Sequence, residues 1–418
     1  MPFDPARPSV STTYAQRVAF ITEIASRLHS YGTTAQRLEI AIVALSRQLG
    51  LDCAPWSNPT GVILSFSDPK QAIGTSDITR VIRLAPGKVD LHKLRVADYV
   101  VDRVAVGRMS ITQGHTILRR LDRAVYPWED IRHMIASAMA VAGVAGLWKL
   151  PWLDLGTASI IGLLIGILGH YAQRHVATLE ASEALAALLS SVVACLVATF
   201  IGPLNLDSVI IASLVVLLPG MELTNAVNEL TSQHWVSGTA RLAGALIIIM
   251  KLVVGAMIAL TLTQRLGLHP RVQLSTPMPT WVEWPSLILA AYGFAVLLKA
   301  NRHDYIWVMA AAIFSYIISR ATAATWGSVA GIFFSGMIVT ALGNLFGRVM
   351  QKPGALIRVP GFILLVPGSS SVRGLLEMIQ QQSVGVGQSA LLLVMNSATA
   401  LVAGLLFGNL VIPPRKFL

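Results

Sequence analysis

The chain has 418 residues, of which 54% are hydrophobic and 13% are charged, with a net charge of +11 at pH 7. This composition excludes an ordinary soluble protein and is typical of a protein with several membrane spans. Only two cysteines are present, Cys53 and Cys195, which argues against a disulfide framework or a cysteine metal site, and the basic excess indicates membrane topology rather than nucleic-acid binding.

Residues 1–130 are predicted to form a small α+β domain that is soluble in water. They hold 28 of the Asp, Glu, Lys and Arg residues, whereas the 288 residues after them hold 25. Helical periodicity over 14–50 and 89–124 flanks short β-like runs between 51 and 85. The sequence contains no phosphate-binding loop, zinc spacing or nucleophile elbow, so we expect no enzyme activity, cofactor or metal.

Ten apolar segments follow, and most approach the roughly 20 residues that a spanning helix needs. They form two sets of five, in residues 131–263 and 282–411. The predicted fold is therefore an α-helical polytopic membrane protein with ten transmembrane helices. The approximate segments are 132–149, 156–173, 184–201, 207–220, 239–263, 284–299, 305–320, 327–346, 359–370 and 388–410.

The fourth and ninth segments are short, and each meets a Pro-Gly pair. A glutamate follows ten residues after each proline: Pro219-Gly220 precedes Glu229, and Pro367-Gly368 precedes Glu377. The 148-residue offset between the prolines predicts an internal repeat of five helices. Because five is odd, the second copy must insert upside down, and such inverted, interrupted repeats are typical of secondary transporters. The alternative is that both prolines merely end helices at the membrane surface.

The Lys and Arg residues predict the orientation of the spans. Basic residues are more frequent on the loops that share a side with the N-terminal domain, and four of them precede the first span: Arg119, Arg120, Arg123 and Arg132. We therefore expect the N-terminal domain and the tail 413–418 in the cytoplasm. The expected partners are the lipid bilayer, protons and a small substrate, without nucleic acid, and homo-oligomerisation is left open.

Ionisable residues within the spans are candidates for ion coupling, because a charge at the bilayer centre costs about 2.5–3.5 kcal/mol. Lys251 lies deep in its segment and is interpreted either as a structural partner of a carboxylate or as a proton-coupled residue. Arg241 begins the same helix and is expected to extend to the interface. Asp207 lies near the entrance of the interrupted fourth segment.

The two glutamates after the breaks are predicted to differ. Arg373 precedes Glu377 by one helical turn and favours its ionised form, whereas Glu229 lies among asparagines. Glu229 is therefore the predicted proton carrier.

The residues after each break are predicted to bind the substrate. A helix that restarts after Pro-Gly presents free N–H groups and a positive dipole end, which suit a carboxylate. Glu222 or Glu229 would receive an ammonium group, and side-chain amides and hydroxyls a hydroxyl group, so a small zwitterion fits. The predicted substrate-binding residues are Pro219, Gly220, Glu222, Thr224, Asn225, Asn228, Pro367, Gly368, Ser369, Ser370 and Ser371.

Five stretches in a specific order resemble the motifs of a known family. They are YGTTAQRLEIAIVALSRQLGL, NPTGVILSF, VDLHKLRVADYVVDRVAVGRMS, LLPGMELTNAVNELTSQHWVSGTARL and LLVPGSSSVRG. Over nearly its whole length the chain resembles the threonine/serine exporter family, whose members join a soluble domain to ten spans. The resemblance implies export of L-threonine and L-serine across the bacterial inner membrane, driven by the proton-motive force. The chain departs from the family pattern at Glu229, where an aspartate is expected.

Three alternatives stay open at this point. In a small dicarboxylate exporter, Lys251, Arg241 and Arg373 would serve a second carboxylate. A membrane receptor or scaffold would act through the soluble domain, and an intramembrane enzyme would need a metal set or Ser-base pair that the spacing does not provide. The repeat favours transport, because alternating access needs two related, mobile halves.

Overall fold

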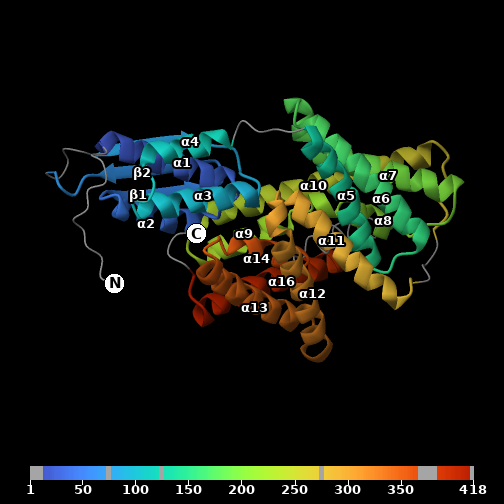
Figure 1. Cartoon of the computed structure of the whole chain (residues 1–418). Helices are drawn as coiled ribbons and strands as arrows, with labels where there is room; N and C mark the ends of the chain where they lie inside the picture. The colour runs from blue at the N-terminus through green and yellow to red at the C-terminus, as the bar shows by residue number, and fades with distance from the viewer. Residues whose placement is uncertain (1–12, 72–76, 122–126, 273–276, 366–383, 415–418) are drawn as a thin grey trace.

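The computed structural model describes residues 13–71, 77–121, 127–272, 277–365 and 384–414, and these residues are largely α-helical (Figure 1). The N-terminal part, coloured blue to cyan in Figure 1, lies at one end of the molecule. Beside it, the green helices of the first half and the orange-to-red helices of the second half pack together.

The N-terminal part, within its described residues, holds four helices and an antiparallel sheet of three strands in the order β1-β2-β3. Asn58 pairs with Gly61 across the turn between β1 and β2, as the NPTG sequence indicated. The elements are α1 (Tyr14–Ser30), α2 (Ala35–Gln48), β1 (Asp52–Asn58), β2 (Gly61–Ser67), β3 (Ile78–Arg83), α3 (Leu91–Ala105) and α4 (Ile111–Arg120).

The core of the N-terminal part follows from the helical periodicity of the sequence. Four residues of α1 at helical spacing are all buried: Val18, Ile21, Ile24 and Leu28. They pack in one cluster with Leu64 of β2 and Val101 of α3. His29 is also buried, and its Nε2 donates to the Asn58 carbonyl at 2.9 Å.

The membrane part continues with long apolar helices. Their bounds are α5 (Pro127–Leu147), α6 (Trp152–Ala172), α7 (Val176–Phe200), α8 (Leu206–Ser213), η1 (Val215–Leu217), α9 (Gly220–Thr231), α10 (Trp235–Arg265), η2 (Thr280–Val282), α11 (Glu283–Leu297), η3 (Arg302–Asp304), α12 (Tyr305–Trp326), α13 (Ser328–Met350), α14 (Ala355–Ile363) and α16 (Val384–Val411).

Seven helices among the described residues are long and apolar enough to cross a membrane, and the bent pair of α8 with η1 and α9 would make an eighth. Large apolar side chains such as Ile160, Met250 and Ile258 are exposed on these helices, as lipid-facing residues would be. The protein is therefore a multi-span membrane protein. The count of ten spans stays a prediction, because α14 has nine residues and the residues that follow it lie outside the described part.

The two halves repeat the same pattern of helix packing. In the first half α5 packs on α6, α6 on α7 and α7 on α10; in the second half α11 packs on α12, α12 on α13 and α13 on α16. The short helix before each Pro-Gly, α8 or α14, contacts the second and third helices of its own half. The element order therefore recurs at about the spacing that the two Pro-Gly pairs indicated.

Helices α5 and α11, the first of each half, contact each other through very small residues. A side chain on Gly143 would collide with the backbone of Ala290, and one on Gly293 would collide with the backbone of Ala140. Gly143 and Gly293 are 150 residues apart, as are Ala140 and Ala290. Ala140 of α5 meets Gly293 of α11, and Gly143 meets Ala290, so the two helices run antiparallel. Each glycine meets the equivalent of the other's alanine, so the contact is reciprocal, as it would be across a two-fold axis.

The N-terminal part is joined to the second half by a continuous hydrophobic core. Leu298, which follows α11, and Leu356 and Ile357 of α14 belong to the same buried cluster as Phe20 of α1. Backbone hydrogen bonds add to this contact: the amides of Leu91 and His92, at the start of α3, donate to the carbonyls of Leu298 and Lys299 at 3.0 and 3.1 Å. The first half has a separate core.

Candidate functional site

The membrane part is interrupted at the first Pro-Gly pair. Helix α8 ends at Ser213, the short turn η1 follows, and α9 begins at Gly220 with Pro219 as its N-cap. The helix axis bends by 44° between Leu206–Ser213 and Val215–Thr231. The predicted interruption of the fourth segment is confirmed, although α8 ends six residues before the proline. The residues of the second predicted break lie outside the described part of the chain: Pro367, Gly368, Ser369, Ser370, Ser371, Arg373 and Glu377.

The centre of the polar region is Glu229, near the end of α9, whose side chain is 0% exposed. Its two carboxylate oxygens each accept from Nε of Arg241 at 3.0 Å. Oε2 also accepts from the Ser237 hydroxyl at 2.6 Å. Both donors come from the first turns of α10, which turns back along α9, so the α9–α10 connection positions all three side chains.

Arg241 joins both acidic residues of α9. Its Nη1 donates to Oε2 of Glu222 at 3.0 Å, while its Nε serves Glu229. The Arg241 side chain is 8% exposed and that of Glu222 is 39% exposed. The expectation that Arg241 extends to the interface is therefore wrong: two carboxylates neutralise it inside the protein, which removes the reason for a cation to seek the headgroups. We call Glu222, Glu229, Ser237 and Arg241 the α9–α10 polar cluster.

The N-terminal part also binds this cluster. The backbone amide of Ala35, the first residue of α2, donates to Oε1 of Glu229 at 2.9 Å. Thr34 at the N-cap makes no side-chain capping bond, so Glu229 caps α2 in its place. Nearby, His234 Nε2 lies 3.0 Å from Oε2 of Glu39, and Oε1 of the same residue accepts from the Ser57 amide.

These contacts change the interpretation of Glu229. Three donor groups from α2 and α10 converge on a carboxylate that water does not reach. To accept a proton, Glu229 would have to give up one of these bonds, whereas Glu222 is partly exposed and has one ion pair. The geometry therefore favours a structural role for Glu229 and leaves Glu222 as the more accessible carboxylate.

The remaining predicted residues of the first break surround this cluster unevenly. Thr224 is buried, and its hydroxyl donates back to the Gly220 carbonyl at 3.2 Å. Asn228 is buried, and within the described residues its Oδ1 has no hydrogen-bond partner. Asn225 is half-buried on the same helix, while Asp207 is exposed at the first turn of α8 and does not join the cluster.

Lys251 lies apart from the cluster. Its Nζ donates to the Glu180 carbonyl at 2.7 Å and lies 3.5 Å from Oε2 of Glu183, and its side chain is 37% exposed. Of the two interpretations of this lysine, these contacts support a structural partner of a carboxylate; its depth in the membrane stays a prediction. Because α7 packs along α10, the flexible lysine stem reaches the first turns of α7, where a partly exposed carboxylate pairs with it.

Arg358 in α14 was not predicted as a site residue. It is 5% exposed, and within the described part of the chain its Nε and Nη2 are buried without a hydrogen-bond partner. Its stem lies against Gly343, where a side chain would sit 2.8 Å from Cγ of Arg358. A buried guanidinium normally requires an anion. The sequence gave no signal that Arg358 is buried, because a basic residue near the end of a span ordinarily indicates only membrane topology.

The chain matches two family models. One, described as "Putative threonine/serine exporter", matches residues 19–263, more than half of the chain. The other, described as "Threonine/Serine exporter, ThrE", matches residues 286–411. The two matches divide the chain near the boundary between its two halves. No solved structure matches the chain.

Several curated proteins are similar to the chain at low identity. A Mycobacterium tuberculosis protein named "Probable threonine/serine exporter" is 22% identical over 388 residues, or 90% of this chain and 72% of that protein. Proteins named "Pheromone-regulated membrane protein 10" are 23% identical in Zygosaccharomyces rouxii and 24% identical in Saccharomyces cerevisiae. These matches cover 87% of this chain but only 38% and 48% of the yeast proteins, so the chain spans half or less of these longer relatives.

Proposed function

The chain belongs to the threonine/serine exporter family, and from this premise we propose that it is a secondary active transporter for small hydroxy amino acids, L-threonine and L-serine, driven by the proton-motive force. The observation that carries this proposal is the interrupted helix α8–α9 within a bundle whose packing pattern occurs twice. Interrupted helices free backbone groups at the depth where transporters bind their substrates.

An inverted repeat is part of the proposal. It is supported by the antiparallel, reciprocal contact of α5 with α11, because equivalent helices of an inverted pair must run in opposite directions. Ten spans, with the N-terminal part and the C-terminus in the cytoplasm, complete this topology. The prokaryotic relative suits the bacterial inner membrane, although the yeast relatives belong to eukaryotic membranes.

The proposed substrate contacts combine both halves of the molecule. Glu222, partly exposed in the first turn of α9, would receive the ammonium group, and Oδ1 of Asn228 would accept from the hydroxyl. Helix α9 packs against α14, which carries Arg358, and that guanidinium would bind the carboxylate. Glu222 and Glu229 already neutralise Arg241, so Arg241 is not free to bind a second carboxylate of a substrate. This favours a zwitterionic substrate over the dicarboxylate alternative.

Flux into proteoliposomes tests this function. Purified chain should exchange labelled serine and threonine, respond to an imposed proton gradient, and leave labelled succinate behind. Arg358→Gln should abolish amino-acid flux, whereas Arg80→Gln, on the exposed strand β3, serves as the control with the same charge change. Succinate flux without serine or threonine flux would support the dicarboxylate hypothesis in place of this proposal. Absence of flux for all three substrates would contradict the proposal.

A further inference from the structure

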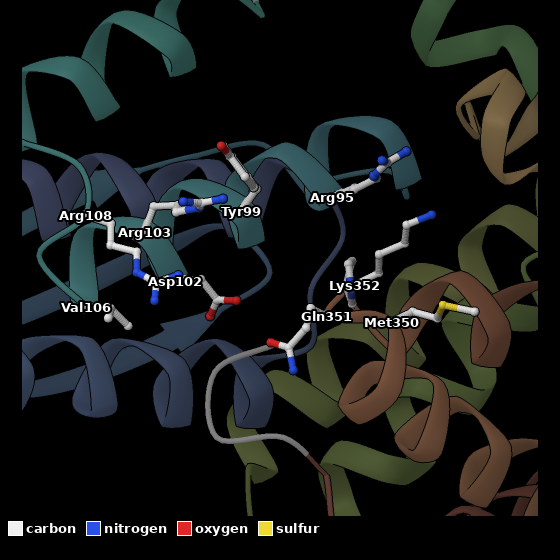
Figure 2. A pocket seen from close by; sticks show the side chains of 10 residues that line it. Arg95, Tyr99, Asp102, Arg103, Val106, Arg108, Met350, Gln351 and Lys352 are labelled. Atoms are coloured by element: carbon white, nitrogen blue, oxygen red, sulfur yellow. The ribbon is translucent and has the colours of Figure 1, made fainter. Parts of the chain in front are cut away.

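A cavity of about 610 Å³ lies where the N-terminal part meets the end of α13, and its walls come from two regions far apart in the chain. Helix α3 and the residue after its turn contribute Arg95, Tyr99, Arg103 and Arg108, and the segment after α13 contributes Lys352 (Figure 2). A volume of this size is typical of sites that hold a small molecule or a headgroup.

Four of the five charged residues that line the cavity are basic, and the fifth is Asp102. Arg95 and Lys352 both pair with the buried carboxylate of Asp304, with Lys352 Nζ at 2.7 Å from Oδ1. Each keeps further N–H donors that Asp304 does not use, since an arginine has five and a lysine three. The pairing therefore fixes two cations at one end of the cavity without exhausting their donors.

The other end of the cavity holds two more cations. Arg103 lies over the ring of Tyr99, with Cζ 5.2 Å from the ring centroid. Helix α3 ends at Ala105, Gly107 after it is left-handed at φ 71°, and the Arg108 amide donates back to the Arg103 carbonyl at 2.9 Å. This turn brings Arg108 to the same wall as Arg103. The carboxylate residue Asp102 of α3 also lines this end of the cavity, so a phosphate would bind on the arginine side of it.

The lower rim of the cavity is apolar and lies at the end of a membrane helix. Helix α13 is one of the candidate spans and ends at Met350, which lines the cavity. Met350 and the neighbouring Val349 are 44% and 67% exposed. Because a span leaves the hydrocarbon at its end, we expect the basic walls at the level of lipid headgroups, next to an apolar surface suited to acyl chains.

We propose that this cavity binds the phosphate of an anionic phospholipid, with Arg103 and Arg108 as its main ligands and the acyl chains along the end of α13. Guanidinium groups match phosphate oxygens in pairs, and basic pockets beside membrane helices bind anionic headgroups. Because the walls come from both α3 and the segment after α13, a bound lipid would hold the N-terminal part against the membrane part.

The test measures lipid binding to the full-length chain by native mass spectrometry in detergent. Wild type should bind phosphatidylglycerol in preference to phosphatidylcholine. The double variant Arg103→Gln/Arg108→Gln should bind phosphatidylglycerol about 30-fold more weakly, because each basic residue at an anionic surface contributes roughly a factor of five. The control Arg80→Gln/Arg83→Gln removes the same charge from the exposed strand β3 and should bind as wild type does.

Two further arms separate the possible sources of phosphate and guard against misfolding. Soluble glycerol phosphate and inorganic phosphate should not displace the lipid at matched concentrations; displacement by either would overturn the lipid as the ligand. Should the glutamine variant unfold, Arg103→Lys/Arg108→Lys keeps the charge but loses the paired donors, and it should still bind phosphatidylglycerol more weakly than wild type. Equal affinity in all variants, or no preference over phosphatidylcholine, would overturn the site.

Discussion

The N-terminal part is attached to the membrane part at two buried carboxylates, and the two attachments differ in what surrounds them. Glu229 is enclosed: a backbone amide, a hydroxyl and a buried guanidinium bind it. Asp304 is equally buried, but its partners, Arg95 and Lys352, are 32% and 25% exposed and face a cavity. The first attachment is therefore rigid, whereas the second has partners that can move and bind something else.

Glu229→Gln should give the largest effect, because the substitution leaves Arg241 with only the partly exposed Glu222 and removes the negative charge from the cap of α2. Breaking a buried pair costs about 3–5 kcal/mol, so we expect a large drop in melting temperature in detergent. Glu222→Gln, which changes the same charge at a more exposed position, should cost far less. A stable Glu229→Gln protein that exchanges substrate but has lost gradient-driven efflux would instead restore Glu229 as the proton carrier.

Asp304→Asn should destabilise the protein less than Glu229→Gln, by about 2 kcal/mol, because Arg95 and Lys352 can turn to the cavity and regain water. The melting temperature should fall moderately, and protease should cut more readily between the N-terminal and membrane parts. A loss as large as that of Glu229→Gln would show that the two attachments are equally rigid.

Lys251→Met provides a comparison away from both attachments. Its ion pair with Glu183 is partly exposed, and such pairs contribute about 0–1 kcal/mol. The melting temperature and flux should both stay near wild-type values. Loss of transport in a stable Lys251→Met protein would give this lysine a role in the transport cycle that its position in the structure does not indicate.

His29→Gln should give the smallest effect, visible only as a change in pH dependence. Burial lowers the pKa of His29 below 6.5, and the positive charge of Arg241 acts in the same direction against the opposing hydrogen bond to Asn58. The unfolded chain therefore binds a proton at about pH 6.5 while the folded chain does not, so stability is lost as the pH falls below 6.5.

The measurement for His29 compares melting temperatures at pH 7.5 and 5.5. Wild type should lose more than His29→Gln between these values, whereas His269→Gln, at an exposed position, should follow wild type. An identical pH response in His29→Gln and wild type would show that this histidine titrates alike in the folded and unfolded chains.

Local patterns in the sequence were sufficient to predict individual helices and the position of the first helix break. The spacing of Val18, Ile21 and Leu28 predicted helix α1 and its buried face, and Pro219-Gly220 predicted the break before α9. These features depend on backbone chemistry and on neighbours within a few residues. The α9–α10 polar cluster was partly predictable for the same reason, because Glu229 and Arg241 are only 12 residues apart.

The partners across the fold could not be read from the sequence. Ala35 and Glu229 are 194 residues apart, and Arg95 and Asp304 are 209 apart, so no local periodicity links them. Glu229 is bound by the backbone amide of Ala35, and any residue type except proline has such an amide, so the residue type at this position gives no signal of the contact. The partner of Lys251 could not be predicted, because position along one helix does not reveal how closely the start of α7 approaches it.

The contact between α5 and α11 has a mechanical consequence. Gly143 and Gly293 let the two backbones meet, and Val144 and Phe294 are buried beside this contact. If the halves rock against each other during transport, we expect the smallest displacement at this point, where the two backbones are in closest contact. The N-terminal part is bound to α9 at Glu229 and to the second half through a continuous hydrophobic core, so it would resist a rotation of the two halves about the α5–α11 contact.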